Sequence, residues 1–223
     1  MITVNLASIP SRKEQLINTL NSLLNQTLQP NKINVCLNNY KEIPFKHPLI
    51  NYVFSDNSLG DAGKFLFLKN YKGYYLTVDD DLIFSKSYIK DMVTEIDEFG
   101  IVTHHGRSFT SFPIDSYYKT PTSKKVRCLS EEIGTGIVQF GGTGVMGFHT
   151  SIINPPIEIF KTSNMADIYF GLYAKSQNKY IWCLRHSKDY IKYQFVNDTI
   201  YDIKSNSDSF ETEVINNYYT KCK

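Results

Sequence analysis

The sequence predicts an α/β fold, in which a mostly parallel central sheet is flanked by helices within a single domain. Short β-branched apolar runs alternate with segments whose leucines recur at helical spacing, a pattern typical of parallel strands joined by right-handed helical crossovers. The 223 residues match the length of one domain, and 42% of them are hydrophobic, enough for a substantial core. We expect residues 1–186 to form this domain and residues 187–223 to form a C-terminal extension packed on it.

The first hundred residues carry the clearest alternation. Strands are predicted at residues 2–6, 33–37, 50–54 and 74–78, because each is a short apolar run that ends at polar or turn-forming residues. A helix is predicted from residue 12, with Ser11 as its N-cap, and another over residues 87–98, ending before Gly100. Residues 65–70 are expected to form a short helix.

The second half is less regular. Strands are predicted at residues 101–105, 137–140, 145–149 and 180–184, and a helix over residues 164–178. Residues 107–136 are polar, aromatic and rich in turn-forming residues, so we expect a loop that is too long to be an inert connector. The polar tail after Ser187 is open to three interpretations: an acceptor platform, an oligomer contact or a simple cap.

Composition argues against several function classes. A formal net charge of +2 is too small to indicate nucleic acid as the main partner. One dense basic run, residues 119–127, fits a solvated loop and a position near an anionic ligand equally well. The four cysteines, Cys222 among them, form no CxxC pair, which argues against a zinc site. Without a signal-peptide pattern or a long apolar run, we expect a cytoplasmic protein, and peripheral association with a membrane stays open.

Three consecutive aspartates, Asp79, Asp80 and Asp81, directly follow the apolar strand at residues 74–78. Neighbouring carboxylates at the mouth of a buried strand repel one another, so they need a cation or a basic partner. Open α/β sheets bind ligands at the carboxyl ends of their strands, and oxygen ligands suit Mg²⁺ or Mn²⁺ together with substrate phosphates. Side-chain alternation predicts that Asp79 and Asp81 face one way and Asp80 the other. The alternative, a solvated acidic turn, is disfavoured by the apolar strand.

Because of this aspartate cluster and the segments around it, the sequence resembles the nucleotide-sugar glycosyltransferases of the GT-A fold, in particular the large family 2 group. The resemblance covers roughly residues 1–186 and rests on four segments in order: ITVNLASIPSR, SDNSLGDAGKF, VDDDL as the DxD motif, and MADIYFGLYAKSQNK. A DxD motif alone arises often by chance, whereas four segments in this order are more specific. The resemblance implies a Rossmann-like GT-A domain, a nucleotide-diphosphate sugar (a UDP sugar above all), a Mn²⁺ or Mg²⁺ cofactor, and a glycan or surface-polymer acceptor.

The resemblance also implies roles for single residues. The loop after the first strand would hold the nucleoside, and the segment after the third strand would lie near the base, ribose or diphosphate. The implied donor-site residues are Ala7, Ser8, Pro10, Arg12, Asp56, Gly60, Asp61, Lys64, Asp79, Asp80 and Gly142. The implied metal ligands are Asp81, Asp79 and His186. For Lys64 there is a separate physical argument, because a cation opposite a diphosphate offsets its charge; the glycines around Gly142 could equally form a plain tight turn.

Asp167 is the implied catalytic base. In inverting members of the group, an acidic residue at the start of this helix takes the proton of the acceptor hydroxyl, and Ala166 here replaces a neighbour that is commonly acidic. The other interpretation is that Asp167 only stabilises the helix N-terminus. His104 and His105 end a strand and are further candidates for acceptor contacts.

Two other functions fit parts of the sequence. A sugar nucleotidyltransferase also combines a nucleotide site with acidic metal ligands, but the first loop, LASIPSRKE, lacks the glycines that such enzymes use to bind a triphosphate. The other alternative is a non-catalytic domain that binds nucleotide or glycan without turnover.

Overall fold

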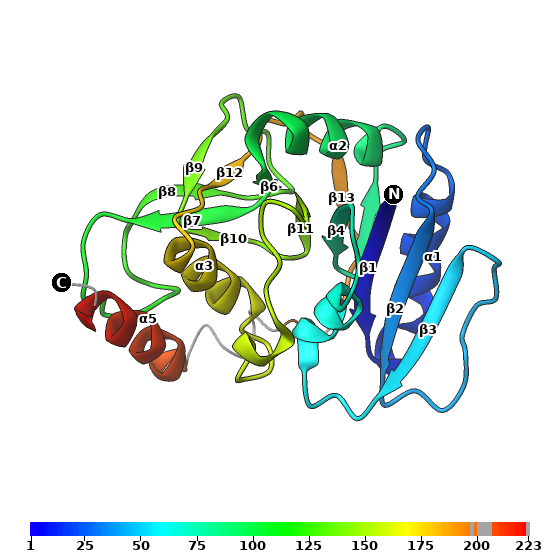
Figure 1. Cartoon of the computed structure of the whole chain (residues 1–223), viewed down its shortest axis with the longest axis horizontal. Helices are drawn as coiled ribbons and strands as arrows, with labels where there is room; N and C mark the ends of the chain where they lie inside the picture. Colours follow the sequence, from blue (N-terminus) through cyan, green and yellow to red (C-terminus); the bar gives the residue numbers. More distant parts are fainter. Residues whose placement is uncertain (197–198, 200–206, 222–223) are drawn as a thin grey trace.

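The computed structural model describes residues 1–196, 199 and 207–221, and its largest feature is an eight-stranded sheet (Figure 1). Its strands are β1 (Ile2–Ser8), β2 (Lys32–Asn38), β3 (Ile50–Ser55), β4 (Tyr74–Val78), β6 (Ile101–Thr103), β9 (Gly136–Val138), β11 (Val145–His149) and β12 (Ile181–Cys183). They lie in the order β3-β2-β1-β4-β11-β6-β12-β9. Only β11 and β9 run antiparallel to their neighbours, so the sheet is mostly parallel, as predicted.

Helical segments cover both faces of this sheet. The segments are η1 (Pro10–Arg12), α1 (Lys13–Leu24), η2 (Gly60–Leu68), α2 (Tyr88–Phe99), η3 (Ile157–Ile159) and α3 (Ala166–Ser176). Leucines of α1 and apolar residues of α2 pack with β1, β2 and β4 in one core, because they recur every three or four residues along each helix. A second core contains Phe65 of η2 and Phe170 of α3, whose rings lie 5.8 Å apart.

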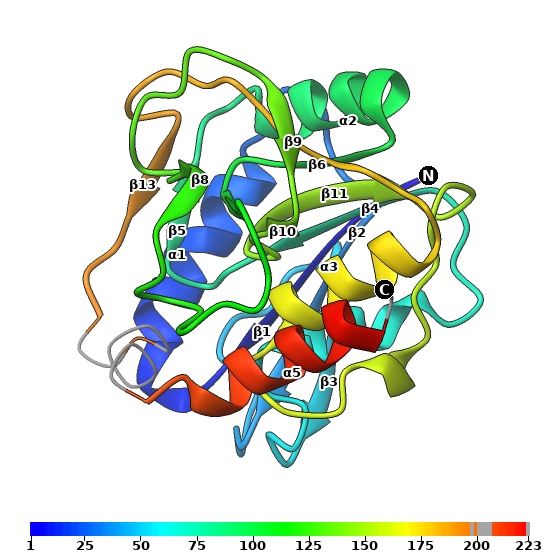
Figure 2. The ribbon, with the colours of Figure 1, turned by 90° about the vertical axis from the view of Figure 1, so that its left-hand side faces the viewer.

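Two smaller sheets border the large one. The first is antiparallel and contains β7 (Gly106–Phe109), β8 (Thr122–Val126) and β10 (Phe140–Gly141); the second pairs β5 (Leu82–Phe84) with β13 (Ile191–Tyr193). The C-terminal helix α5 (Ser209–Lys221) lies beside α3 (Figure 2). Tyr219 of α5 stacks on Phe112 with ring centroids 3.6 Å apart, and Asn216 exchanges hydrogen bonds with the backbone of Ile114.

Most predicted elements are present, with four corrections. Ser11 is not an N-cap, because it lies inside η1 and the cap residue of α1 is Arg12. The helix expected at 65–70 is the longer 3₁₀ helix η2. The expected strand at 137–140 is split, because β9 pairs with β12 whereas β10 pairs with β7. The expected loop at 107–136 contains β7 and β8, whose polar residues pair across the small sheet.

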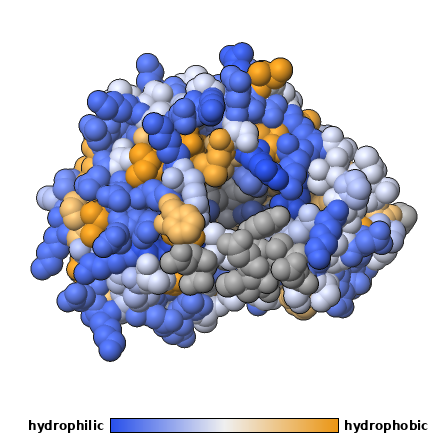
Figure 3. All heavy atoms as spheres, turned by 180° about the vertical axis from the view of Figure 1, so that it is seen from behind, coloured by the Kyte–Doolittle hydropathy of each residue, from blue (hydrophilic) through white to orange (hydrophobic). Residues whose placement is uncertain are grey.

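Within the described ranges, no helix is long and apolar enough to cross a membrane. One face of the molecule is mostly hydrophilic, with apolar side chains in small separate patches (Figure 3). Cys222 and parts of the predicted C-terminal extension lie outside the described residues.

Candidate functional site

A single cavity of about 780 Å³ collects most of the residues singled out in the sequence. It opens at the carboxyl ends of β1 and β4, where ligands bind in open α/β sheets. The predicted residues that line it are Ala7, Ser8, Arg12, Gly60, Asp61, Lys64, Asp79, Asp80, Asp81, His105, Gly142 and Asp167. The folding of the chain therefore unites the three N-terminal segments with the start of α3, more than 80 residues further on.

Each aspartate of the triplet lies near a basic residue. Lys64 Nζ donates to Asp79 Oδ1 at 2.5 Å, and Arg12 Nη1 lies 2.7 Å from Asp81 Oδ2 and 3.6 Å from Asp80 Oδ1. The chain turns directly after β4, so Asp80 and Asp81 both reach Arg12 and the expected strand-like alternation does not hold. Lys64 is only 2% exposed, which makes it a structural partner of Asp79 as well as a cation lining the pocket.

Burial shapes the charges of this cluster. Burial, and then repulsion from Asp79, raise the pKa of Asp81 to about 6, although Arg12 lowers it. Burial also raises the pKa of Asp80 to about 7 against the hydrogen bond from Ser8. Burial alone would lower the pKa of Lys64, but the carboxylates of Asp79 and Asp61 outweigh it and raise the pKa. The site therefore holds a protonated lysine among carboxylates, and any further positive charge would stabilise the ionised form of these carboxylates.

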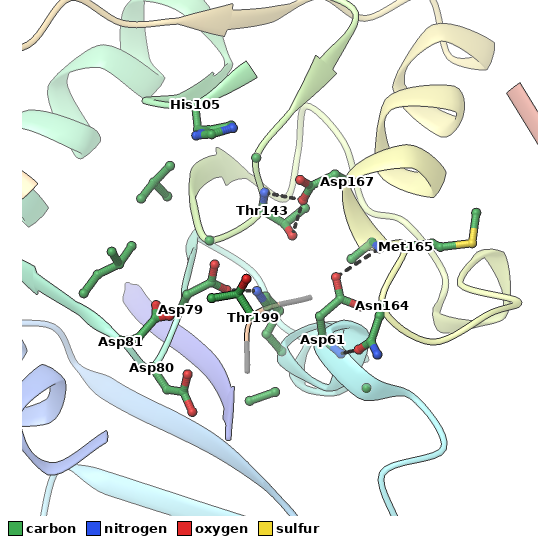
Figure 4. Close-up of a pocket in the computed structure, with 18 of the residues that line it drawn as sticks. Asp61, Asp79, Asp80, Asp81, His105, Thr143, Asn164, Met165, Asp167 and Thr199 are labelled. Carbon is green, nitrogen blue, oxygen red and sulfur yellow. Dashed lines mark hydrogen bonds and ion pairs between the residues drawn. The ribbon is translucent and has the colours of Figure 1, made fainter. Parts of the chain in front are cut away.

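Asp167 lies across the cavity from the triplet, at the first turn of α3 (Figure 4). Its Oδ1 accepts two hydrogen bonds from Thr143, one from the backbone N–H and one from the hydroxyl, both at 2.7 Å. No donor from the described part of the chain reaches Oδ2. The carboxylate is therefore held in a fixed orientation by one oxygen, while the other is available to a substrate.

Asp61 connects η2 to the start of α3. Its Oδ2 accepts a hydrogen bond from the backbone N–H of Ala166 at 3.1 Å, and its own N–H donates to Asn164 Oδ1 at 3.3 Å. A distant side chain thus serves as the N-cap acceptor of α3, which has no side-chain cap from its own N-cap residue, Met165. Gly60 allows this close approach, because a Cβ there would lie 2.4 Å from Asn164 Oδ1.

Four predicted residues do not line this cavity. Pro10 begins η1 at the surface, and Asp56 is exposed, where it accepts a hydrogen bond from Ser58 N at 3.0 Å. His104 and His186 line a separate, smaller cavity, where their rings pack against each other and His186 Nδ1 lies 3.0 Å from Leu184 O. The structure therefore does not bring His186 together with Asp81, because the chain after β12 runs to Glu132 rather than back to the triplet.

The carboxylates of the triplet suit a hard divalent cation only in part. Among the described residues, no group of three or more His, Cys, Asp or Glu side chains is arranged to hold a metal ion. Asp79 and Asp81 nevertheless line the same pocket and repel each other, which a cation would relieve. Mg²⁺ and Mn²⁺ commonly take one or two carboxylates and complete their shell with water and substrate phosphates. The residues therefore fit such an ion together with phosphate ligands.

Several lining residues were not singled out from the sequence. Asn57 and Asn164 line the pocket, and Thr143 holds Asp167. Arg107 and Tyr117 line the pocket from the segment expected to be a loop. The only sequence signal for this last group was the nearby basic run, because the contacts depend on the pairing of β7 with β8.

This chain is similar to known proteins in structure but not in sequence. No protein-family profile and no curated sequence matches it. Its fold is similar to crystal structures of TarS from S. aureus, a glycosyltransferase of the GT-A family. For TarS 1–349 with UDP-GlcNAc the TM-score is 0.53 at 16% identity over 89% of this chain, and with UDP it is 0.51 at 17% identity over 84%. For a longer TarS structure the TM-score is 0.51 at 18% identity over 90%.

The chain spans 60%, 59% and 38% of the length of these three TarS chains. At such low identity the likeness establishes architecture alone. The mostly parallel central sheet, flanked by helices on both faces, matches that architecture. The chain therefore has a GT-A-type α/β fold.

Proposed function

We propose that this chain is a glycosyltransferase that moves the sugar of a nucleotide-diphosphate sugar, a UDP sugar in first place, to a hydroxyl group of a glycan or surface polymer. One observation carries the proposal: a single cavity on a GT-A-type fold has the aspartate triplet on one side and the oriented carboxylate of Asp167 on the other. The TarS structures with UDP-GlcNAc and UDP support the choice of donor.

On the donor side, the residues after β1 and along η2 would receive the nucleotide. Ala7, Ser8 and Asn57 line the end of the cavity formed by β1 and the β3–η2 connection. Asp79 and Asp81 would hold a Mn²⁺ or Mg²⁺ ion that neutralises charge on the diphosphate. Lys64, fixed by Asp79, adds a buried positive charge near that group.

On the acceptor side, Asp167 would act as general base. Thr143 holds Oδ1, so Oδ2 is the atom that would take the proton of the incoming hydroxyl. Attack from this side, opposite the leaving diphosphate, is a single displacement and gives inversion at the anomeric carbon. Asp61 fixes the start of α3 and so keeps the base in place while the donor is bound.

Thermal unfolding with a nucleotide panel tests the donor half of this proposal. UDP, UDP-GlcNAc, GDP, CMP and dTDP sugars are added to the protein with and without Mn²⁺. We expect one nucleotide to raise the unfolding temperature, more strongly with Mn²⁺, and Asp81→Asn to remove the metal-dependent part. A chain that no nucleotide stabilises, with or without metal, but that binds glycans would be a glycan-binding domain instead.

A further inference from the structure

The small sheet of β7 and β8 places positive charge on the side of the pocket that holds Asp167. Arg107 of β7 lies opposite Lys125 of β8 in the strand register, and Arg127 follows β8 directly. All three residues line the main cavity. The side chains of Lys125 and Arg127 are exposed, while Val126 between them is buried in the core.

Arg107 is a buried cation whose contacts are not with a carboxylate. It is 7% exposed, yet no ion pair involves it among the described residues. Instead, Nη1 donates to Tyr117 O at 2.8 Å, and the guanidinium lies 4.4 Å and 5.2 Å from the ring centroids of Tyr117 and Tyr118. Stacking on aromatic rings fixes the orientation of a guanidinium and leaves its other N–H groups available to an anion.

The two other cations of the pocket differ from this group. Arg12 and Lys64 each lie within 4 Å of an aspartate of the triplet. Lys125 and Arg127 have no such partner among the described residues, and the pKa of Lys125 is lowered by burial and then by Arg107 and Arg127. The three cations are thus close enough to repel one another, an arrangement that a bound anion would stabilise.

The position of Arg107, Lys125 and Arg127 favours contact with the acceptor over contact with the donor. Figure 1 shows β7 and β8 on the side of the molecule opposite β2 and β3. After burial, Asp167 contributes to the raised pKa of Tyr118, ahead of Arg107, which lowers it. Glu211 of α5 also lines the pocket and, like Asp167, contributes to the raised pKa of Tyr118.

We propose that Arg107, Lys125 and Arg127 form an acceptor subsite that selects a glycan bearing a negatively charged group, a phosphate ester or a carboxylate, close to the hydroxyl that is glycosylated. The inference rests on the proposed glycosyltransferase function, since it names the acceptor class of that same pocket. A phosphate and a carboxylate share the chemistry that a guanidinium recognises, so the experiment separates them.

The test uses three small probes without donor: N-acetylglucosamine, N-acetylglucosamine 6-phosphate and glucuronic acid. Their dissociation constants are measured by NMR titration for the wild type, for Lys125→Gln/Arg127→Gln and for Lys119→Gln/Lys124→Gln. The last variant removes the same two charges from the same basic run at positions that do not line the pocket, so it is a matched control. Arg107→Lys, which keeps the buried charge but loses the planar fork, tests the third residue.

We expect at least one charged probe to bind at least about tenfold more tightly than the neutral sugar, a difference that Lys125→Gln/Arg127→Gln abolishes and the control keeps. The charged probe that is preferred identifies the phosphate or the carboxylate as the group recognised. Arg107→Lys should weaken that probe while the protein remains folded by circular dichroism.

Two results would overturn the subsite. One is an equal loss of charged-probe binding in the control Lys119→Gln/Lys124→Gln. This loss would indicate only non-specific electrostatic attraction by the basic run. The other is a loss of UDP-induced stabilisation in Lys125→Gln/Arg127→Gln with unchanged probe binding, which would assign these cations to the donor diphosphate. Because the probes are titrated without nucleotide, failure of the acceptor subsite is distinguished from failure of donor binding.

Discussion

Asp61 Oδ2 accepts a hydrogen bond from Ala166 N, although the two residues are 105 positions apart in the chain. Through this contact, a residue of η2 caps the helix that carries Asp167 at its next position. One carboxylate therefore joins the two sides of the pocket that we propose bind the nucleotide and the acceptor, and a change at Asp61 should act on both.

The cap can be removed and restored by substitution. Asp61→Ala leaves Ala166 N without its acceptor, whereas Asp61→Asn keeps a carbonyl oxygen at that place. We expect Asp61→Ala to be less stable than Asp61→Asn by about 1 kcal/mol in urea unfolding, the usual size of a lost N-cap. Turnover should fall further in Asp61→Ala than in Asp61→Asn. Equal stability of the two variants would show that the cap contributes nothing.

The same residue makes stability depend on pH. Burial is the main cause that raises the pKa of Asp61 from 3.8 to about 7, and Lys64 opposes it. The folded state therefore holds this proton more tightly than the unfolded chain, so the stabilising contribution is fully present below about pH 3.8 and is lost as the pH rises through about 7. We expect the unfolding temperature of the wild type, relative to Asp61→Asn, to fall between pH 5 and pH 8, measured without metal or nucleotide. Parallel curves for the two proteins would contradict this.

Gly144 controls the position of Asp79. A Cβ at Gly144 would lie 1.9 Å from Asp79 Oδ2, so Gly144→Ala must displace this carboxylate from its place beside Lys64. Because the displaced group is the end of a side chain, the fold should survive. We expect a loss of about tenfold or more in apparent Mn²⁺ affinity, from metal-dependent thermal shifts with UDP.

Gly134→Ala is the matched control for Gly144→Ala. A Cβ at Gly134 would lie 3.9 Å from Glu132 Oε1, an ordinary contact distance. This variant should bind Mn²⁺ and UDP as the wild type does. Unchanged affinity in Gly144→Ala as well would mean that the position of Asp79 is irrelevant to metal binding.

Thr143 should act as a positioning residue for Asp167. Thr143→Val removes the hydroxyl hydrogen bond to Oδ1 but keeps the backbone one, with little change in side-chain volume. We expect kcat to fall about tenfold, the effect of one hydrogen bond to a charged group, with KM for the donor unchanged. Thr143→Ser should restore most of kcat. A rise in donor KM without a change in kcat would assign Thr143 to donor binding instead.

The parts of the fold that were predicted correctly carry local signals. The apolar run of β4 leads directly into Asp79, and the apolar residues of α2 recur at helical spacing up to Gly100, which has a positive φ of 84°. Such patterns depend only on residues that are close in sequence, so these elements can be predicted without a structure.

The parts that were missed depend on distant partners. β8 has the sequence TSKKV, with little apolar character, and exists as a strand because β7 pairs with it. α5 is weakly amphipathic, and its place is fixed by contacts such as that of Tyr219 with Phe112. His186 was predicted as a metal ligand because it follows β12, but the direction of the chain after a strand is set by tertiary contacts such as its bridge to Glu132.

Cleavage of UDP sugars by single-residue variants shows whether Asp81 and Asp167 form the active site of a glycosyltransferase. UDP release from a panel of UDP sugars is measured with Mn²⁺ for the wild type, Asp81→Asn and Asp167→Asn, with and without the preferred acceptor probe. We expect the wild type to release UDP and Asp81→Asn to lose both UDP stabilisation and UDP release. Asp167→Asn should keep UDP stabilisation but lose roughly 10²-fold or more in acceptor-dependent release. If both variants released UDP as fast as the wild type, neither Asp81 nor Asp167 would take part in catalysis, and the proposed function would be wrong.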